Sequence, residues 1–96
     1  MIKQKFVKYG HTFECILSGE IHSIYKRTTK AGNDCGYEVI RPVVIGGDLV
    51  YPSSSFWGLY GWTALNYEHA LEIFSRKETE FLNKNNNVCS ENHEDT

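Results

Sequence analysis

The pattern of apolar residues changes once along this chain of 96 residues. Up to Tyr51 the apolar residues mostly follow the two-residue period of β-strands, and turns containing glycine separate the runs. After Asn66 they recur at spacings of three and four residues, which is typical of a helix with one apolar face. Strands followed by a single helix predict an α+β fold.

Short runs rich in β-branched and aromatic residues predict the strands. A turn at residues 10–11 predicts a hairpin near the N-terminus. Along its second strand, Phe13, Cys15 and Leu17 should share one face, because side chains alternate along a strand. Pro42 lacks the N–H group that a sheet requires, so it indicates a bulge or an edge position. The predicted strands are residues 3–9, 12–17, 21–29, 37–45 and 49–51.

A single amphipathic helix is predicted over residues 67–82. Asn66 is a favourable N-cap, and Glu68 lies in the first turn, where the helix dipole stabilises an anion. Residues 83–96 contain five asparagines and few apolar residues, so they are predicted to be a disordered polar tail. The apolar stripe predicted to pack on the sheet is Tyr67, Ala70, Leu71, Ile73, Phe74 and Phe81.

These elements predict one domain over residues 1–82. Its sheet is an antiparallel meander of four to five strands, with the C-terminal amphipathic helix packed on it. A hydrophobic content of 41% and a charged content of 23% exclude a disordered chain or a fibre. No apolar run approaches the ~18 residues of a transmembrane helix, so no membrane partner is predicted. The N-terminus lacks the apolar run of a signal peptide, which predicts a cytoplasmic protein with free thiols.

No catalytic motif is found in the sequence. The residues His11, Cys15, His22 and Cys35 are zinc-ligand types, but their spacing along strands would keep them apart, so no metal site is predicted. Cys15 lies on the predicted core face, where thiols are inert, and Cys35 lies in the predicted loop 30–36 without an activating base. We therefore predict a protein that is not an enzyme and needs no cofactor.

The net charge of −2 conceals an uneven distribution. Residues 1–30 hold six basic groups against two acidic groups, whereas acidic groups predominate in residues 31–96. Basic side chains on neighbouring hairpins, with Tyr9 and Tyr25 for stacking, would suit a nucleic acid, although binders of this kind are usually basic overall. Nucleic-acid binding is therefore kept as an alternative, with Lys3, Lys5, Lys8, Lys26, Arg27 and Lys30 as its candidate residues.

Aromatic residues are concentrated between Tyr51 and Tyr67, which hold six of the thirteen in the chain. Trp62 is predicted to be buried near the start of the helix. The other rings are too many for so small a core, and exposed tryptophan and tyrosine are enriched at binding hot spots. Burial beneath the helix is the alternative for these rings. The predicted protein-binding surface is centred on Phe56, Trp57 and Tyr60, with Ser54 in its polar rim.

Four motifs follow one another in the second part of the chain. They are G-Y-E-V at 36–39, tyrosine-proline-serine at 51–53, W-G-x-x-G-W-T at 57–63 and E-x-A-x-x-x-F at 68–74. In these motifs the segment 36–75 resembles small uncharacterised α+β proteins encoded by bacteriophages and prophages. The resemblance supplies no catalytic residues to carry over.

The resemblance implies an accessory protein of a phage or mobile element that binds a host protein in the host cytoplasm. The host protein could be a nuclease or another defence protein that is thereby inhibited. Two alternatives stay open from the residues themselves. One is a small nucleic-acid-binding protein that uses the basic N-terminal hairpins. The other is a self-associating structural accessory protein, for example a homodimer.

Overall fold

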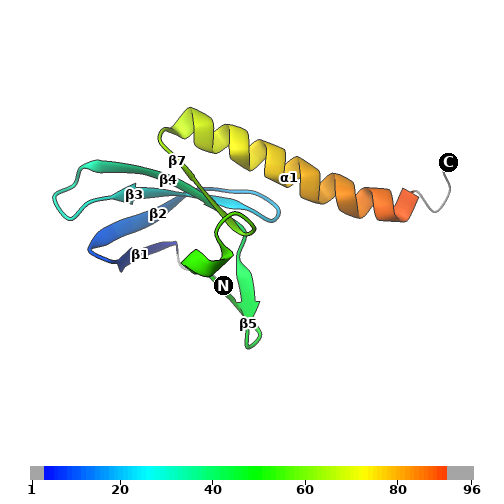
Figure 1. Ribbon diagram of the computed structural model, residues 1–96, viewed down its shortest axis with the longest axis horizontal. Coiled ribbons are helices and arrows are strands. Elements are labelled where there is room, and N and C mark those ends of the chain that lie inside the picture. Colours follow the sequence, from blue (N-terminus) through cyan, green and yellow to red (C-terminus); the bar gives the residue numbers. More distant parts are fainter. Residues whose placement is uncertain (1–3, 91–96) are drawn as a thin grey trace.

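The computed structural model describes the backbone of residues 4–90 and the side chains of residues 4–53 and 55–83. Within these residues seven strands precede a single long helix (Figure 1). The elements are β1 (Lys5–Lys8), β2 (His11–Ser18), β3 (Ser23–Thr28), β4 (Asp34–Ile40), β5 (Val43–Ile45), β6 (Asp48–Val50), the 3₁₀ turn η1 (Ser54–Phe56), β7 (Gly61–Ala64) and α1 (Tyr67–Ser90).

Five of these strands form the main sheet, in the order β1-β2-β3-β4-β7. Every neighbouring pair is antiparallel. Strands β5 and β6 form a separate two-stranded antiparallel sheet between β4 and β7 in the sequence. The predicted α+β class, with an antiparallel sheet and one C-terminal helix, is confirmed. The second sheet and strand β7 were not predicted.

Two tight turns close the hairpins. Tyr9 and Gly10 join β1 to β2 with φ angles of 56° and 76°, and Gly46 and Gly47 join β5 to β6 with φ angles of 61° and 87°. Positive φ at both central residues is the geometry of two-residue hairpin turns. The first turn was predicted one residue too late, because His11 already pairs with Lys8 in the sheet.

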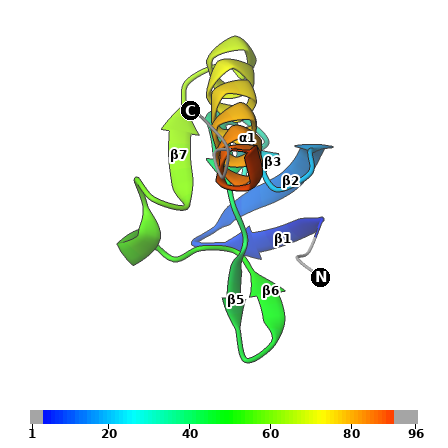
Figure 2. The same ribbon diagram turned by 90° about the vertical axis from the view of Figure 1, so that its right-hand side faces the viewer.

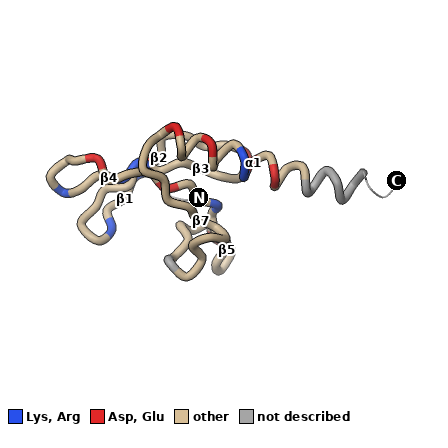
Figure 3. The backbone as a smooth tube through the Cα atoms, turned by 45° about the horizontal axis from the view of Figure 1, so that its top comes forward, with Lys and Arg blue, Asp and Glu red and all other residues tan. Residues whose placement is uncertain are grey.

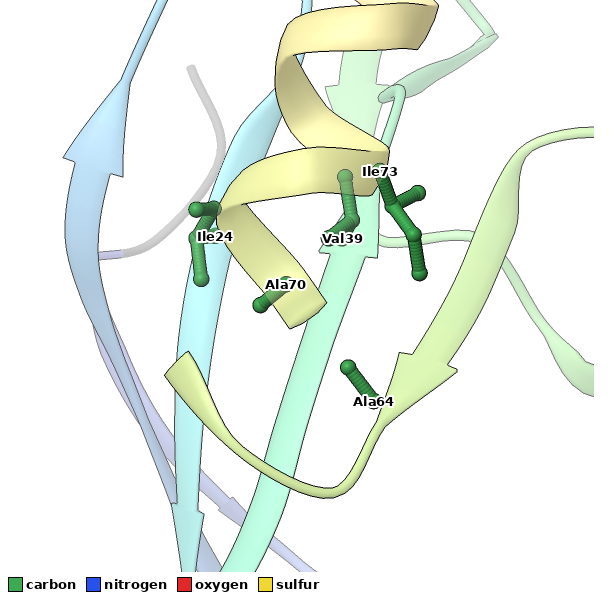
Figure 4. Packing of buried hydrophobic residues seen from close by; sticks show 5 residues of the cluster. All are labelled: Ile24, Val39, Ala64, Ala70 and Ile73. Atoms are coloured by element: carbon green, nitrogen blue, oxygen red, sulfur yellow. The ribbon is translucent and has the colours of Figure 1, made fainter. Parts of the chain in front are cut away.

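The main sheet is packed on both faces, because neighbouring residues along a strand point to opposite sides. Helix α1 covers one face, where five buried residues from β3, β4, β7 and α1 form the helix-side cluster (Figure 4). The opposite face carries a second cluster, in which Tyr51 and Trp57 pack against buried strand residues. The helix-side cluster is Ile24, Val39, Ala64, Ala70 and Ile73, and the buried residues of the second cluster are Phe13, Tyr25 and Ile40.

A β-bulge in β2 transfers one side chain to the other face. The register with β3 shifts between Cys15 and Leu17, which is where an extra residue, Ile16, is inserted. Phe13 and Cys15 belong to the second cluster, whereas Leu17 packs against the helix-side cluster. The prediction that all three share one face was therefore wrong for Leu17.

The strand predicted over 37–45 is divided between the two sheets. Strand β4 ends at Ile40 and β5 begins at Val43, so Pro42 lies in the link between two strands. The bulge or edge position predicted at Pro42 is therefore a complete break, which also leaves its missing N–H group outside a sheet. At its other end β4 begins earlier than predicted, at Asp34. Cys35 therefore lies in a strand, half-buried, and not in an exposed loop.

Helix α1 begins where predicted. The backbone N–H of His69 donates to Oδ1 of Asn66 at 2.8 Å, which is the expected N-cap. The helix continues to Ser90, eight residues beyond the predicted end at 82. Neither glycine nor proline follows Gly61 in the sequence, so the chain lacks the usual signals that stop a helix. The last part of the predicted tail, residues 91–96, lies outside the described residues.

The buried face of α1 differs in part from the predicted stripe. Ala70 and Ile73 are buried as expected, but Tyr67 and Leu71 are exposed. The position that completes the buried face is a charged residue, Glu78. The N-terminal half of α1 lies across the sheet, and its C-terminal half extends beyond the sheet (Figure 1).

Candidate protein-binding surface

Tyr51 and Trp57 of the aromatic segment 51–60 lie on the side of the main sheet opposite to α1, whereas Leu59 and Tyr60 line pockets that Phe81 of α1 also lines. Both ribbon views place the hairpin β5–β6 below the sheet when the helix is above it (Figures 1 and 2). Tyr51 and Trp57 of the segment cover the second cluster, and the segment directly follows the hairpin β5–β6 in the chain. The sheet therefore lies between the helix and these two aromatic side chains, which do not seal the end of the helix.

Trp57 is half-buried and contributes to the fold. Its ring packs on the second cluster, 6.4 Å from the Tyr51 ring between centroids. Its indole Nε1–H donates to Oγ1 of Thr63 at 3.0 Å. A Cβ atom on Gly61 would lie 2.4 Å from the Trp57 ring, so only glycine fits there. The predicted binding residue Trp57 is thus held against the sheet.

Phe56 and Tyr60 form a pair beside Trp57. Their rings meet edge to face with centroids 5.5 Å apart, and both side chains are half-buried. The Tyr60 carbonyl accepts from the backbone N–H of Arg41 at 2.8 Å, which ties the segment to the link between β4 and β5. Between the two rings in the sequence, Leu59 is 68% exposed. The side chain of the fourth predicted residue, Ser54, lies outside the described residues.

A buried polar network fixes the start of the aromatic segment. The Tyr51 hydroxyl donates to the carboxylate of Glu38, which is itself buried. Arg27 Nη1 lies 3.5 Å from Glu38 Oε2, and Arg27 Nε donates to His11 Nδ1 at 3.1 Å. Burial, followed by the Glu38 carboxylate, raises the pKa of Tyr51 well above its usual value of 10. Tyr51 therefore keeps its proton and remains a donor to Glu38.

The hairpin β5–β6 exposes three apolar side chains. Val44 is 66% exposed, Ile45 is 59% exposed and Leu49 is 44% exposed. An open groove of about 560 Å³ lies between this hairpin and α1. Its apolar lining includes Ile21, Val43, Val44, Leu49, Tyr60 and Phe81. This groove joins the predicted aromatic residue Tyr60 to a hairpin that the sequence did not single out.

The basic residues proposed for nucleic acid do not form one continuous surface. In the register of the main sheet Lys5 lies opposite Glu14, which lies opposite Lys26. Lys26 also pairs with Asp34 at 3.4 Å. Basic and acidic segments lie close together near the loop that precedes β4 (Figure 3). Of the other candidates, Lys8 and Arg27 line a cavity of about 340 Å³ beside Tyr51, Lys30 lies exposed in the loop before β4, and Lys3 lies outside the described residues.

The metal-ligand types also lie apart. Among the side chains that the structure describes, no group of three or more His, Cys, Asp or Glu residues could hold a metal ion. Cys15 and Cys35 are half-buried free thiols, and Cys89 lies outside the described side chains. Over residues 4–90, no helix has the length and apolar content needed to cross a membrane.

One buried site was missed by the sequence reasoning. The Glu78 carboxylate accepts from the backbone N–H groups of Glu20, Ile21 and His22 at 2.8, 3.0 and 2.6 Å. It also contacts His22 Nδ1 at 2.7 Å. The only signal was the position of Glu78, four residues after Phe74 and three before Phe81 on the predicted apolar stripe.

Folding lowers the pKa of both members of this pair. Burial lowers the pKa of His22 below 6.5, and it outweighs the hydrogen bond and the charge of Glu78, which act the other way. Burial alone would raise the pKa of Glu78, but its hydrogen bonds with the His22 ring and the three backbone N–H groups hold that pKa below 4.5. At neutral pH a neutral His22 therefore donates its Nδ1–H to an ionised Glu78.

Comparisons of the chain with protein-family models, with curated proteins and with solved structures found no match. The resemblance to phage and prophage proteins therefore stays a prediction.

Proposed function

We propose that the protein is a non-enzymatic binding domain that contacts another protein through its hairpin face. We define the hairpin face as Val44, Ile45 and Leu49 of the hairpin together with Leu59 and Tyr60 of the aromatic segment. The observation that carries the proposal is the exposure of the apolar hairpin side chains around an open groove.

The hairpin lacks a stabilising neighbour of its own. Among the described helices and strands, β5 and β6 have their main contacts with each other. An isolated two-stranded hairpin is marginally stable in water, and it gains stability when its apolar side chains pack against something else. A partner seated in the groove would bury Val44 and Leu49 against Tyr60. The hairpin would then become part of a shared core.

The proposed binding surface shares Tyr60 with the surface predicted from the sequence, but it is centred on the hairpin β5–β6 and not on Trp57. Trp57 is engaged with Thr63 and the second cluster, so its contribution to binding is to hold the segment in place. Phe56 supports Tyr60 from the side. The side chains available for contact are the exposed aliphatic ones, and apolar residues of this kind form the core of protein interfaces.

The resemblance to phage-encoded proteins points to a bacterial host protein as the partner, in the host cytoplasm. A nuclease or another defence protein would be inhibited if the domain covered its active surface. This part of the proposal rests on the resemblance alone. The exposed hairpin supports protein binding in general.

The test compares an Ile45→Ser/Leu49→Ser variant with wild type in a pull-down from a bacterial host lysate. Val7→Ser is the matched control, because Val7 is exposed on β1, a strand of the other sheet. We expect wild type and Val7→Ser to capture the same protein, and the hairpin variant to lose it while its circular dichroism spectrum stays unchanged. Retention of that protein by the folded hairpin variant would contradict the proposal.

Self-association is examined with the same three proteins. Sedimentation over a range of concentrations separates a monomer that needs a partner from a homodimer formed through the hairpin face. If wild type is a dimer and the Ile45→Ser/Leu49→Ser variant is a monomer, the partner of the hairpin face is a second copy of the chain and not a host protein. A monomer at all concentrations supports the heterologous partner.

A further inference from the structure

A second open cavity lies between α1 and the link that joins β4 to β5. It has a volume of about 200 Å³ and is lined by His22, Arg41, Leu59, Trp62, Lys77, Glu80 and Phe81. Arg41 and Lys77 are cations, Glu80 is the one carboxylate, and Trp62 and Phe81 are aromatic. This combination differs from the apolar groove next to it, with which it shares Arg41 and Phe81.

Arg41 lies beside two aromatic rings in this cavity and has no counter-charge of its own among the described residues. Its guanidinium carbon lies 4.4 Å from the centre of the Tyr60 ring and 5.3 Å from that of the Phe81 ring. No Asp or Glu among the described residues forms an ion pair with it. Its Nε atom is buried and has no hydrogen-bond partner within the described part of the chain. A buried donor without a partner is unfavourable, and it shows that the hydrogen-bonding capacity of this guanidinium is not satisfied within the described residues.

Lys77 brings a second positive charge to the same cavity. Its Nζ lies 4.8 Å from the centre of the Trp62 ring. Lys77 Nζ also lies 3.5 Å from Oε1 of Glu80, whose side chain is 58% exposed. An ion pair this open to solvent is weak, so Lys77 can reorient towards a ligand at little cost.

His22 also lines the cavity, where it is close to both cations and to the Glu78 carboxylate. Its Nδ1 is engaged with Glu78, and the ring lines the cavity from below the helix. After burial and the opposing effect of Glu78, the charges of Arg41 and Lys77 lower the pKa of His22 further. An anion placed between the two cations would be attracted by the same field.

We propose that this cavity binds one oxyanion group, a carboxylate or a phosphate, with Arg41 as its principal partner and Lys77 as the second. A guanidinium presents planar, paired N–H donors that match the oxygens of either group. The volume suits a single such group with a small substituent, and it is too small for a larger cofactor. The aromatic rings of Trp62 and Phe81 would pack against the carbon part of the ligand.

The cavity adjoins the hairpin face, because Leu59 belongs to that face and lines the cavity, and Arg41 and Phe81 line both the cavity and the groove. The substitutions that test the two proposals are at different residues, however. The two proposals therefore fail separately: the pull-down concerns Ile45 and Leu49, and the anion site concerns Arg41 and Lys77.

The test is an NMR titration of the ¹⁵N-labelled full chain at constant ionic strength. The probes are sodium acetate, inorganic phosphate, and acetamide as the uncharged analogue of acetate, with sodium chloride as the balancing salt. The indole N–H signal of Trp62 reports on the cavity. The indole N–H signal of Trp57, which is bonded to Thr63 on the opposite side of the sheet, is the internal control.

We expect the Trp62 signal to shift in a saturable manner with acetate, with phosphate or with both, and to stay unchanged with acetamide. A response to one anion alone identifies the ligand chemistry. Arg41→Gln should weaken the binding of the anion about tenfold, because the variant loses a hydrogen bond between two charged groups. Arg76→Gln is the matched control, since Arg76 lies exposed on α1 and does not line the cavity.

If Arg41→Gln does not fold, Lys77→Gln takes its place, because Lys77 lies at the helix surface, and about a threefold weakening is expected. The proposal is overturned if neither anion gives a saturable shift at Trp62. It is also overturned if acetamide acts like acetate, or if Arg76→Gln weakens the binding as much as the cavity variants do.

Discussion

The buried carboxylate of Glu78 is expected to be a main determinant of stability, and Glu78→Ala tests this directly. The substitution removes the acceptor for three backbone N–H groups of residues 20–22 and for the ring of His22. These hydrogen bonds join α1 to the turn between β2 and β3, two segments almost sixty residues apart in the sequence. We therefore expect the variant to loosen the helix from the sheet.

The expected loss of stability in Glu78→Ala depends on which of the N–H donors water can reach once the carboxylate is removed. The two bonds to His22 are buried, whereas those to Glu20 and Ile21 are partly exposed and can be replaced by water. Each buried bond to a charged acceptor contributes about 1.5–3 kcal/mol, and a change of His22 tautomer would recover part of one. We expect Glu78→Ala to lower the free energy of unfolding by about 3 kcal/mol, from a total of about 5–10 kcal/mol for a domain of this size.

Urea denaturation followed by tryptophan fluorescence measures this loss. Glu78→Gln should recover about half of it, because the amide oxygen can accept a backbone N–H and the amide nitrogen can donate to the other His22 tautomer. Glu72→Ala is the matched control, since Glu72 is exposed on the same helix, and a change within about 0.5 kcal/mol is expected. A loss below about 1 kcal/mol for Glu78→Ala, or an equal loss for Glu72→Ala, would refute the reasoning.

Three further outcomes are expected. Since the pKa values of His22 and Glu78 are both lowered by folding, the unfolded chain binds more protons, so the free energy of unfolding should fall as pH decreases below about 6.5. Urea denaturation between pH 7.5 and 5 checks this, and a flat profile would contradict it. Asn66→Ala should lower the unfolding free energy by about 1 kcal/mol through loss of the N-cap, measured by thermal denaturation against Asn83→Ala as the control. Gly61→Ala should displace the Trp57 ring and shift its fluorescence, and unchanged emission would argue against the close approach.

The parts of the fold set by local chemistry were predictable from the sequence. Asn66 marks the start of α1 because an N-cap side chain acts on the three residues that follow it. Gly46 and Gly47 mark a hairpin because a two-residue turn requires positive φ at both positions. The break at Pro42 has the same local character, because a missing N–H group affects only its own place in the sheet.

The parts that depend on distant residues were not predictable. The bulge at Ile16 depends on how β2 pairs with β3, and because of this bulge the Leu17 side chain packs against the helix-side cluster. Strand β7 exists because β4 offers it an open edge, not because its own four residues show a strand pattern. Glu78 resembles an ordinary surface residue of a helix until the turn at residues 20–22 is brought against it. The concentration of aromatic residues in segment 51–60 is visible in the sequence, but the sequence could not show which of the rings pack in the core and which are exposed.

Hydrogen exchange of the complex with the captured partner tests the binding surface most directly. If the hairpin face is the contact surface, the amides of β5 and β6, residues 43–50, should exchange rapidly in the isolated protein and become protected in the complex. Those of β1 should be unchanged, because β1 lies in the other sheet, at the edge farthest from β7. Protection confined to β1 or to the exposed face of α1, with residues 43–50 still exchanging rapidly, would contradict the account.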